Sequence, residues 1–237
     1  AVGQSINRWR WDFGDAGTDT IPDPEHLYAA AGTYHVKLYV YSDKGCISDT
    51  MTRTTVVNPL PTVAFANSSP VCETKEITFT DQSQPNAGTL TNRHWNFADG
   101  NTADPASAAP LTHTFAAAGT YNVKLAVQSD KGCKSDTLTQ AVIVRSQPKA
   151  NFILPEVCLN DSYAQFVDSS YIGDGTDSSF IYAWHFGDPN ATAPNPNTAA
   201  LKNPIHKYTA VGDYTASVKV TSIHGCVDSI ARIFTVN

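Results

Sequence analysis

One sequence unit occurs three times along the chain of 237 residues, and this repetition constrains the fold more than any other feature. Each copy opens with an apolar–polar–apolar run that ends in an acidic turn: Arg8–Gly17, Arg93–Gly100 and Tyr182–Pro189. The tryptophans at the centre of these runs, Trp11, Trp95 and Trp184, are 84 and 89 residues apart. Such spacing indicates a tandem array of small domains.

A fixed series of residues follows each tryptophan. Every copy has a His-x-Tyr/Phe, a Gly six residues after the His, a Tyr two residues later and a Cys twelve residues after that. These positions are His26, Gly32, Tyr34 and Cys46; His113, Gly119, Tyr121 and Cys133; and His206, Gly212, Tyr214 and Cys226. Only the stretch between Trp and His varies in length, as expected for a surface loop.

The residues after each Gly alternate between apolar and polar. In the second copy Tyr121, Val123, Leu125 and Val127 share one face, and the other copies repeat the pattern. Period two is typical of a half-buried strand, and no segment has a sustained helical period. We therefore predict an all-β chain of β-sandwiches. In the second copy the strands are expected near residues 62–66, 76–81, 93–97, 121–128 and 138–144.

The repeats divide the chain into domains at 1–58, 59–145 and 146–237. The joints Asn58–Pro61 and Arg145–Pro148 are short and contain proline, so we expect stiff spacers. The first copy starts almost at the run that contains Trp11, so its first two strands, A and B, are missing. We interpret the chain as a fragment of a longer protein; the alternative is that another chain supplies these strands.

Composition and charge argue against several functions. The formal net charge is −6, whereas nucleic acids and anionic membranes attract clustered Lys and Arg. No apolar run approaches the length of a membrane span, so we expect no membrane insertion. No Gly-x-Ser-x-Gly elbow is present, and we expect no enzymatic activity.

The recurring acidic and histidine residues are interpreted as structural. We expect Asp15, Asp99 and Asp188 to close their turns by accepting backbone N–H bonds, and the three histidines to fix the facing strand. Asp12, Asp15 and Asp19 have a spacing similar to a calcium loop, but the other copies lack a common acidic set. We predict no cofactor, with calcium in the first copy as the open alternative.

The stretch "WDFGDAG…HLYAAAGTYHVKLYVYSDKGC" closely resembles the PKD domain, an Ig-like β-sandwich. The resemblance covers the whole chain as one partial and two full copies. It implies extracellular modules of adhesins, fibres and secreted hydrolases, without catalysis. The Gly-Cys turn, with a second Cys before strand B, is similar to PKD domains in long surface proteins of Bacteroidota. We therefore expect an extracellular or bacterial cell-surface location.

Five cysteines occur, at positions 46, 72, 133, 158 and 226. In an Ig-like sandwich strands B and F run the same way, so the start of B and the end of F lie about 20 Å apart. A disulfide needs Cα atoms within about 7 Å. We therefore favour a bond across a joint, Cys72–Cys226, with partners outside the chain for Cys46, Cys133 and Cys158. Bonds within a repeat, and reduced thiols, are the alternatives; either pairing needs an oxidising compartment.

Two further patterns concern surface chemistry. Thr20, Thr50, Thr137 and Ser229 each follow Asp and precede an apolar residue, which looks like the O-glycosylation acceptor of Bacteroidota. The alternative is ordinary strand chemistry. Five aromatic residues could stack on a sugar ring or simply cover strands: Trp9, Tyr39, Tyr41, Tyr171 and Tyr182.

From these features we predict a non-catalytic part of a surface fibre, stalk or adhesin, stiffened by proline joints and disulfides. Its partners would be neighbouring repeats, other copies in a fibre, and a surface polysaccharide or protein. One alternative is a carbohydrate- or protein-binding accessory region of a secreted hydrolase. The other is a self-assembling filament subunit whose first repeat is completed by a neighbour's strands.

Overall fold

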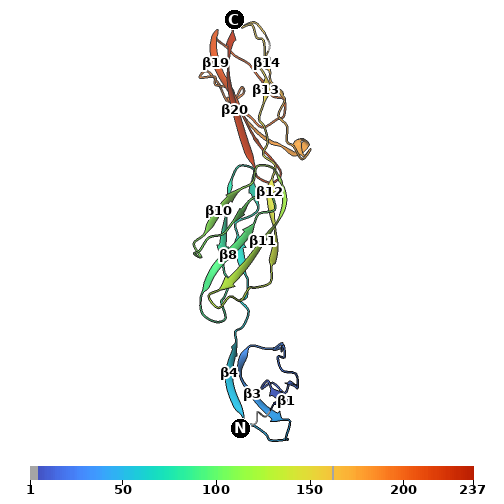
Figure 1. Ribbon diagram of the computed structural model, residues 1–237. Helices are drawn as coiled ribbons and strands as arrows, with labels where there is room; N and C mark the ends of the chain where they lie inside the picture. The colour runs from blue at the N-terminus through green and yellow to red at the C-terminus, as the bar shows by residue number, and fades with distance from the viewer. Residues whose placement is uncertain (1–4, 162) are drawn as a thin grey trace.

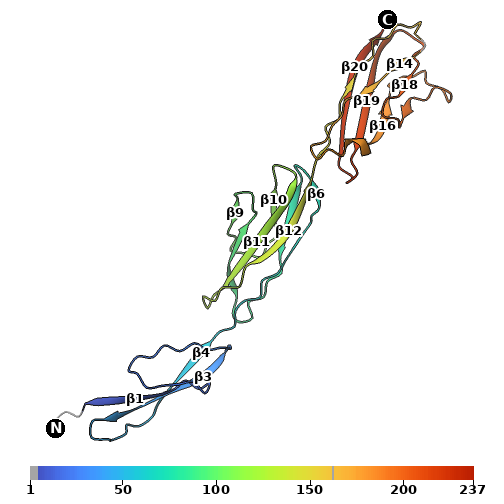
Figure 2. The same ribbon diagram turned by 90° about the vertical axis from the view of Figure 1, so that its right-hand side faces the viewer.

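The computed structural model describes residues 5–161 and 163–237. Three units lie end to end in an elongated molecule, with the two termini at opposite ends (Figures 1 and 2). Of the residues described, only η1 (Asp177–Ser179) is helical, and no helix here is long and apolar enough to cross a membrane.

The second repeat is a complete two-sheet sandwich. One sheet has the order β10-β7-β5 and the other the order β6-β12-β11-β8-β9. The first contains β5 (Phe65–Asn67), β7 (Glu76–Asp81) and β10 (Leu111–Thr114). The second contains β6 (Val71–Cys72), β8 (Leu90–Asn96), β9 (Thr102–Ala103), β11 (Gly119–Ser129) and β12 (Leu138–Arg145). Every pairing is antiparallel except that of β6 with β12.

The sandwich confirms the predicted all-β fold, with one local difference. The strand expected at 62–66 begins only at Phe65, while Thr62 forms an isolated bridge with Gln84. Between them the Ala64 N–H donates to the Ser83 hydroxyl (3.2 Å) instead of a backbone carbonyl. A side-chain hydroxyl thus interrupts the ladder.

Aromatic and branched side chains fill the space between the two sheets. Trp95 on β8 lies opposite Leu125 on β11, and both are buried together with Phe79, Phe97 and Val123. Burial of each large apolar side chain contributes about 1.5–3 kcal/mol. The inward alternation predicted from the sequence is the alternation that forms this core.

The third repeat has the same design with shorter strands in one layer. Its main sheet has the order β17-β16-β19-β20. These strands are β16 (Ile181–His185), β17 (Thr198–Ala199), β19 (Gly212–Thr221) and β20 (Val227–Val236). The opposite layer contains two pairs: β13 (Phe152–Ile153) with β15 (Val167–Asp168), and β14 (Ala164–Gln165) with β18 (Ile205–His206). Between β14 and β15 the Phe166 N–H donates to the Pro204 carbonyl (3.0 Å), where the strand changes partner.

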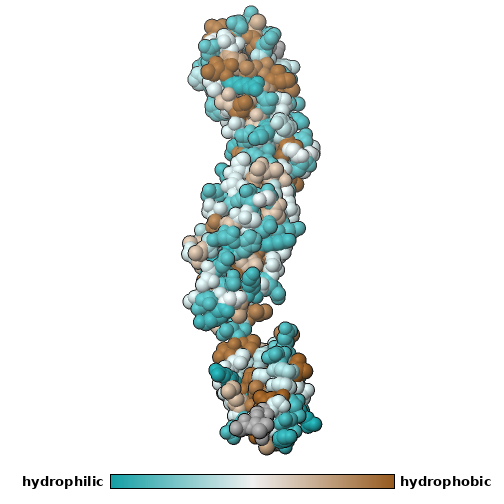
Figure 3. All heavy atoms as spheres, viewed as in Figure 1, coloured by the Kyte–Doolittle hydropathy of each residue, from teal (hydrophilic) through white to brown (hydrophobic). Residues whose placement is uncertain are grey.

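The first repeat consists of one sheet with the order β2-β1-β3-β4. Its strands are β1 (Ile6–Asp12), β2 (Thr18–Asp19), β3 (Gly32–Ser42) and β4 (Met51–Val57). Within residues 5–57 no strand corresponds to β5 or β7, as expected for an incomplete copy. Trp11 and Leu38 are therefore only half-buried, whereas their counterparts Trp95 and Leu125 are fully buried. Figure 3 shows more hydrophobic surface on this unit than on the middle one.

The turn after each tryptophan strand requires a left-handed backbone. The third residue after each tryptophan has a positive φ: 82° at Gly14, 62° at Ala98 and 68° at Gly187. A Cβ on Gly187 would lie 2.3 Å from the Thr215 carbonyl oxygen, which is closer than any normal contact. Glycine is thus required in the third repeat, whereas the second repeat tolerates Ala98 in the same conformation.

We expect Gly187→Ala to lower the free energy of unfolding of the third repeat by about 2 kcal/mol or more, through backbone strain and the clash. Its matched reverse, Ala98→Gly, should change the second repeat by less than about 1 kcal/mol. Relief of the left-handed strain is partly offset by the greater freedom of unfolded glycine. Hydrogen exchange by mass spectrometry resolves the repeats. Equal protection of the third repeat in Gly187→Ala and the unmodified chain would contradict this assignment.

Candidate functional site

In every repeat the acidic turn residue joins its own turn to the histidine of the His-x-Tyr/Phe motif. In the second repeat Asp99 Oδ1 accepts the N–H of Asn101 (3.0 Å), and Asp99 Oδ2 lies 2.7 Å from His113 Nε2. The equivalent carboxylate–histidine distances are 2.7 Å for Asp15–His26 and 2.9 Å for Asp188–His206. We call each of these contacts an Asp–His bracket.

The histidine of each bracket belongs to a column of rings. His113 stacks on Phe97 (4.0 Å between ring centroids) and meets Phe115 edge-on (4.7 Å). Phe115 in turn stacks on Tyr121, whose hydroxyl donates to the Ala117 carbonyl (2.8 Å). The same column occurs around His26 and around His206. The Tyr hydroxyl that bonds a backbone carbonyl upstream is the tyrosine corner of Ig-like sandwiches.

Burial decides between a structural and a catalytic use of the bracket. The side chains of Asp188 and His206 are at most 1% exposed, so a substrate could not reach them. Those of Asp99 and His113 are 15% exposed, and those of Asp15 and His26 slightly more. In the second and third repeats the bracket therefore joins the two layers of the sandwich, and in the third repeat it is closed to solvent.

The carboxylates of two brackets are stabilised as anions. The hydrogen bond from His26 holds the pKa of Asp15 below its usual range, with the Gly17 N–H adding to the effect. Burial raises the pKa of Asp99, but hydrogen bonds from His113 and Asn101 outweigh it, so that the net shift is downward. Both groups are therefore ionised at neutral pH.

We expect His113→Ala to lower the free energy of unfolding of the second repeat by about 2–3 kcal/mol, because it removes a charge-assisted hydrogen bond and a ring stack. His94→Ala is the matched control within the same repeat. His94 also lies 2.7 Å from a carboxylate, that of Asp104, but both side chains are more than half exposed. We expect a change within about 0.5 kcal/mol there. Similar losses for both variants, measured by repeat-resolved hydrogen exchange, would rule out the bracket as a special contact.

Acid should weaken the brackets. Because the folded pKa of Asp99 is lowered, its contribution to stability is present above the usual Asp pKa of about 3.9. That contribution is lost as the pH falls through the lowered folded value. We expect Asp99→Asn to be less stable at pH 7 and to show a shallower stability loss between about pH 5 and 2. Urea unfolding with pulse-labelling hydrogen exchange measures this, and parallel pH profiles for the two proteins would refute it.

A disulfide joins the second and third repeats. Cys72 and Cys226 are bonded, with Cα atoms 5.7 Å apart. Cys72 ends β6, which lies beside the end of β12, and Cys226 lies in the turn after β19. This is the pairing favoured from the sequence. The alternative bonds within a repeat, Cys72–Cys133 and Cys158–Cys226, are not formed.

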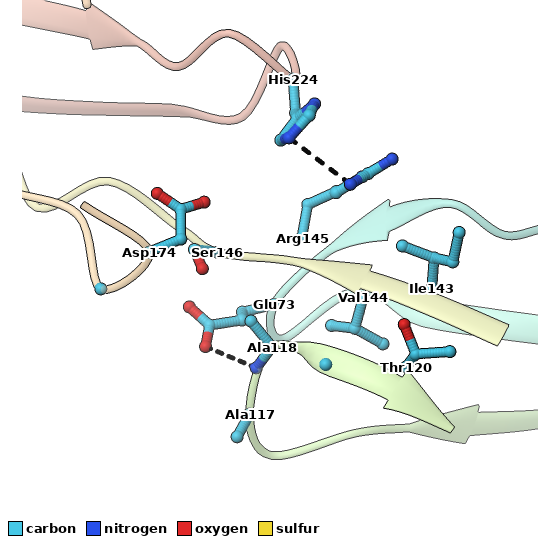
Figure 4. Close-up of a pocket in the computed structure, with 12 residues that line it drawn as sticks. Glu73, Ala117, Ala118, Thr120, Ile143, Val144, Arg145, Ser146, Asp174 and His224 are labelled. Atoms are coloured by element: carbon cyan, nitrogen blue, oxygen red, sulfur yellow. Dashed lines mark hydrogen bonds between the residues drawn. The ribbon is translucent and has the colours of Figure 1, made fainter. Parts of the chain in front are cut away.

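Polar contacts surround this disulfide. The Glu73 carboxylate accepts the N–H groups of Ala118 and Gln147, each at 2.8 Å, and so connects the second repeat to the joint. Across the joint Arg145 donates to His224 Nε2 (3.4 Å). Figure 4 shows these side chains around a hollow of about 510 Å³ that is lined by both repeats. The joint is therefore held at several points besides the chain itself.

The other three cysteines are unpaired in the structure. Cys46 and Cys158 are exposed, and Cys133 is half-buried, with Sγ 4.0 Å from the Asn58 carbonyl oxygen. Cys133 is the counterpart of Cys226 and lies at the joint between the first two repeats. Cys158 is the counterpart of Cys72, and its neighbour Leu159 donates to the carbonyl of Asn237 (2.7 Å). It therefore lies at the end of the third repeat that faces away from the second.

The carboxylates of the calcium-like spacing are used in local turns. Asp12 accepts the N–H of Gly14 and pairs with Lys37, Asp15 forms its bracket, and Asp19 accepts the N–H of Ile21 (3.1 Å). Within the part of the chain that is described, no three acidic, His or Cys side chains gather to hold a metal ion.

The predicted modification and stacking residues differ in exposure. All four glycosylation candidates, Thr20, Thr50, Thr137 and Ser229, are exposed. Among the stacking candidates Tyr171 is exposed, and Trp9, Tyr39 and Tyr41 line one groove. Tyr182 is wrong as a sugar platform: it is 7% exposed, and its hydroxyl donates to Asp168 Oδ2 (2.9 Å). Burial also raises the pKa of this Tyr182 hydroxyl, with Asp168 adding to the effect.

Sequence reasoning missed several polar residues. Arg93 and Asp81 form a buried ion pair between the two layers of the second repeat. Glu73 at the joint was also missed, and a lone Glu after a Cys gives no signal for its two backbone partners. Arg8 and Arg10 in the groove were missed too, although the alternation Arg-Trp-Arg-Trp at 8–11 was a usable signal for two cations on one strand face.

The PKD domain family matches residues 2–57, 58–144 and 145–237. The chain therefore belongs to the PKD domain family, and it contains three such domains. PKD domains are generally non-catalytic modules.

Parts of larger proteins are similar to this chain. A pre-pro-metalloprotease PrtV from Vibrio cholerae is 29% identical over 128 residues, which are 54% of this chain and 14% of that protein. The collagenase ColQ1 from Bacillus cereus is 42% identical over 65 residues, which are 27% of this chain and 7% of that protein. The chain thus spans only a small part of the length of these proteins.

Two solved structures are also similar. The PKD1 domain of Vibrio anguillarum Epp is 29% identical, with 38% of this chain and 94% of that chain covered and a TM-score of 0.31. The PKD1 domain of the Vibrio cholerae metalloprotease PrtV is 26% identical, with 37% and 99% covered and a TM-score of 0.32.

Proposed function

We propose that the chain is a stiff, non-catalytic spacer within an extracellular bacterial protein built from PKD repeats, such as a surface fibre, stalk or adhesin shaft. The observation that carries this proposal is the Cys72–Cys226 bond between successive repeats. A repeat that needed only to fold would gain as much from a bond within itself. A bond between repeats instead restricts their relative motion.

The chemistry of the joint supports stiffness. The repeats are connected covalently twice, by the chain at 145–148 and by the disulfide. The side-chain amide of Gln147 donates to the Val227 carbonyl, and its backbone N–H donates to the Glu73 carboxylate (2.8 Å). The Ala150 N–H donates to Asp228 Oδ2 (2.8 Å). Bending at this joint would break several of these contacts together.

The same bond supports an extracellular location. Disulfides form and persist in oxidising compartments. The PKD-containing relatives come from secreted proteins, and attachment to a cell surface is part of the proposal. An origin in Bacteroidota, suggested by the sequence pattern, is likewise part of it.

Equivalent positions extend the proposal to the remaining cysteines. If Cys72 bonds the repeat that follows it, Cys158 would bond a fourth repeat by the same geometry. Cys133 would bond the missing part of the first repeat, and Cys46 a repeat that precedes it. The exposed Thr50, Thr137 and Ser229 would carry O-linked glycans along the outside of such a fibre, whereas the fourth candidate, Thr20, borders a groove of the first repeat.

A second candidate function is an accessory region of a secreted hydrolase, one that binds carbohydrate or protein. The similarity to parts of a metalloprotease and a collagenase favours it. A hydrolase domain elsewhere in the full gene would discriminate it from the fibre. A concentration-dependent mass would instead favour a filament subunit completed by a neighbour's strands.

We expect the variant Cys72→Ser/Cys226→Ser to bend more at the second joint. Small-angle X-ray scattering should give a broader distribution of interatomic distances and a smaller mean end-to-end distance than the unmodified chain. The third repeat should also lose about 2–4 kcal/mol of unfolding free energy, as is typical for loss of a disulfide.

Cys46→Ser is the matched control, because Cys46 is exposed and unpaired; it should leave the scattering curve unchanged. A non-reducing peptide map of the protein from its native source should first identify the Cys72–Cys226 peptide. A superimposable curve for the double variant would show that the bond does not set the stiffness, and the spacer proposal would fail.

A further inference from the structure

Two arginines lie opposite two tyrosines on the outer face of the first repeat. In the register of β1 and β3, Arg8 faces Tyr41 and Arg10 faces Tyr39. Residues at i and i+2 of a strand point to the same side, so the four side chains form a two-by-two patch. The rings of Tyr39 and Tyr41 have centroids 5.9 Å apart.

These four residues border an open groove of about 640 Å³, which we call the Arg–Tyr groove. Thr20, Ile21 and Pro22 form its other side. The patch lies on the face of the sheet opposite to Trp11 and Leu38, which point toward the core. The side chains of the two arginines and the two tyrosines therefore point away from the core face, and Trp9 also borders the groove.

The two guanidinium groups are free to bind an anion. Within residues 5–161 and 163–237 neither forms an ion pair or a side-chain hydrogen bond. The acidic side chains nearby have other partners: Asp12 pairs with Lys37, and the Asp19 carboxylate accepts backbone N–H groups. Asp43 lines a separate, smaller hollow beside Arg8 without an ion pair. An unpaired cationic pair is notable on a chain with a net charge of −6.

The other two repeats show that the fold does not need these residues. At the same places the second repeat has Asn92 opposite Gln128 and His94 opposite Ala126, and its hollow is smaller, at about 390 Å³. His94 is occupied by Asp104. The third repeat has Ile181 opposite Thr221, and Ala183 opposite Lys219. Three unrelated sets support the same sheet, so the fold itself does not account for the set in the first repeat.

We propose that the Arg–Tyr groove binds an acidic polysaccharide that contains uronic acid residues. Tyr rings present flat apolar faces on which the C–H face of a pyranose ring stacks, with the phenolic hydroxyl free to hydrogen-bond. Arg presents a planar fork of donors that matches a carboxylate. A carboxylate-bearing sugar chain uses both features at once. Polyglutamate, which has carboxylates but no ring, would use the arginines alone. The proposal goes beyond the spacer function and does not depend on it.

Affinity electrophoresis tests this with polygalacturonate as the uronic acid polymer. We expect the whole chain to be retarded by polygalacturonate and to pass unaffected through neutral dextran. Tyr39→Ala/Tyr41→Gln and Arg8→Asn/Arg10→His import the residues of the second repeat. Each pair should weaken binding about tenfold or more, because stacking and charge-assisted hydrogen bonds act together.

Matched variants keep the result interpretable. Asn92→Ala/Gln128→Ala changes the same places in the second repeat and should leave binding unchanged. Circular dichroism shows whether each variant is folded, and since the second repeat carries the imported residues naturally, we expect all to fold. No retardation by polygalacturonate, or equal retardation by dextran, would overturn the proposal. So would equal retardation by polyglutamate that persists in Tyr39→Ala/Tyr41→Gln, which would identify a surface for acidic peptides.

Discussion

Each repeat depends on a hydrogen bond between the aspartate of a turn and the histidine of its His-x-Tyr/Phe motif. The turn aspartate is fixed by a backbone N–H on one oxygen, so its other oxygen points at the histidine of the opposite layer. The histidine is then held flat against Phe97 and edge-on to Phe115, and this orientation sets the ring column down to Tyr121. One polar contact thereby aligns two sheets that otherwise meet through non-directional apolar packing. The first repeat retains its column although its described residues form no strand that corresponds to β5, β7 or β10, and its Phe13 remains buried.

The joint between the second and third repeats follows from the same topology. β6 pairs with the end of β12, from which the chain continues directly into the third repeat. Cys72 at the end of β6 therefore lies beside Cys226 in the turn after β19. Glu73 follows Cys72 directly, so the residue that clamps the joint is positioned by the bonded cysteine. At the first joint Cys133 occupies the place of Cys226, beside the Asn58 carbonyl. Each joint therefore has a cysteine in the turn after the long strand of one of its repeats: Cys226 at the second joint and Cys133 at the first.

The repeat made the fold predictable, because residues that recur at fixed offsets in three copies are those that the fold of every copy requires. The repeat predicted the alternating strand at 121–128 and the role of Asp99 in its turn. It also predicted that Cys72 and Cys133 lie at opposite ends of one sandwich, which favoured the Cys72–Cys226 pairing. Contacts peculiar to one copy had no such support. The Ser83 hydroxyl accepts the Ala64 N–H, and β5 therefore begins one residue later, at Phe65. The Arg93–Asp81 ion pair occupies the position that Tyr182 and Asp168 occupy in the third repeat. Tyr182 was kept as a stacking candidate, although it lies within β16 two residues before Trp184, and strand alternation therefore places it on the same buried face.

The two faces of the main sheet are under different constraints. The inner face repeats Trp, Phe and branched residues in every copy, since a change there would disturb the ring column and the core. The outer face differs in all three copies, with Arg8 and Tyr41, Asn92 and Gln128, or Ile181 and Thr221 at one cross-strand pair. A surface that is free to vary can acquire binding chemistry in one repeat without loss of stability. An array of this design can therefore combine a stiff shaft, set by inner faces and joints, with a ligand site on the outside of a single repeat.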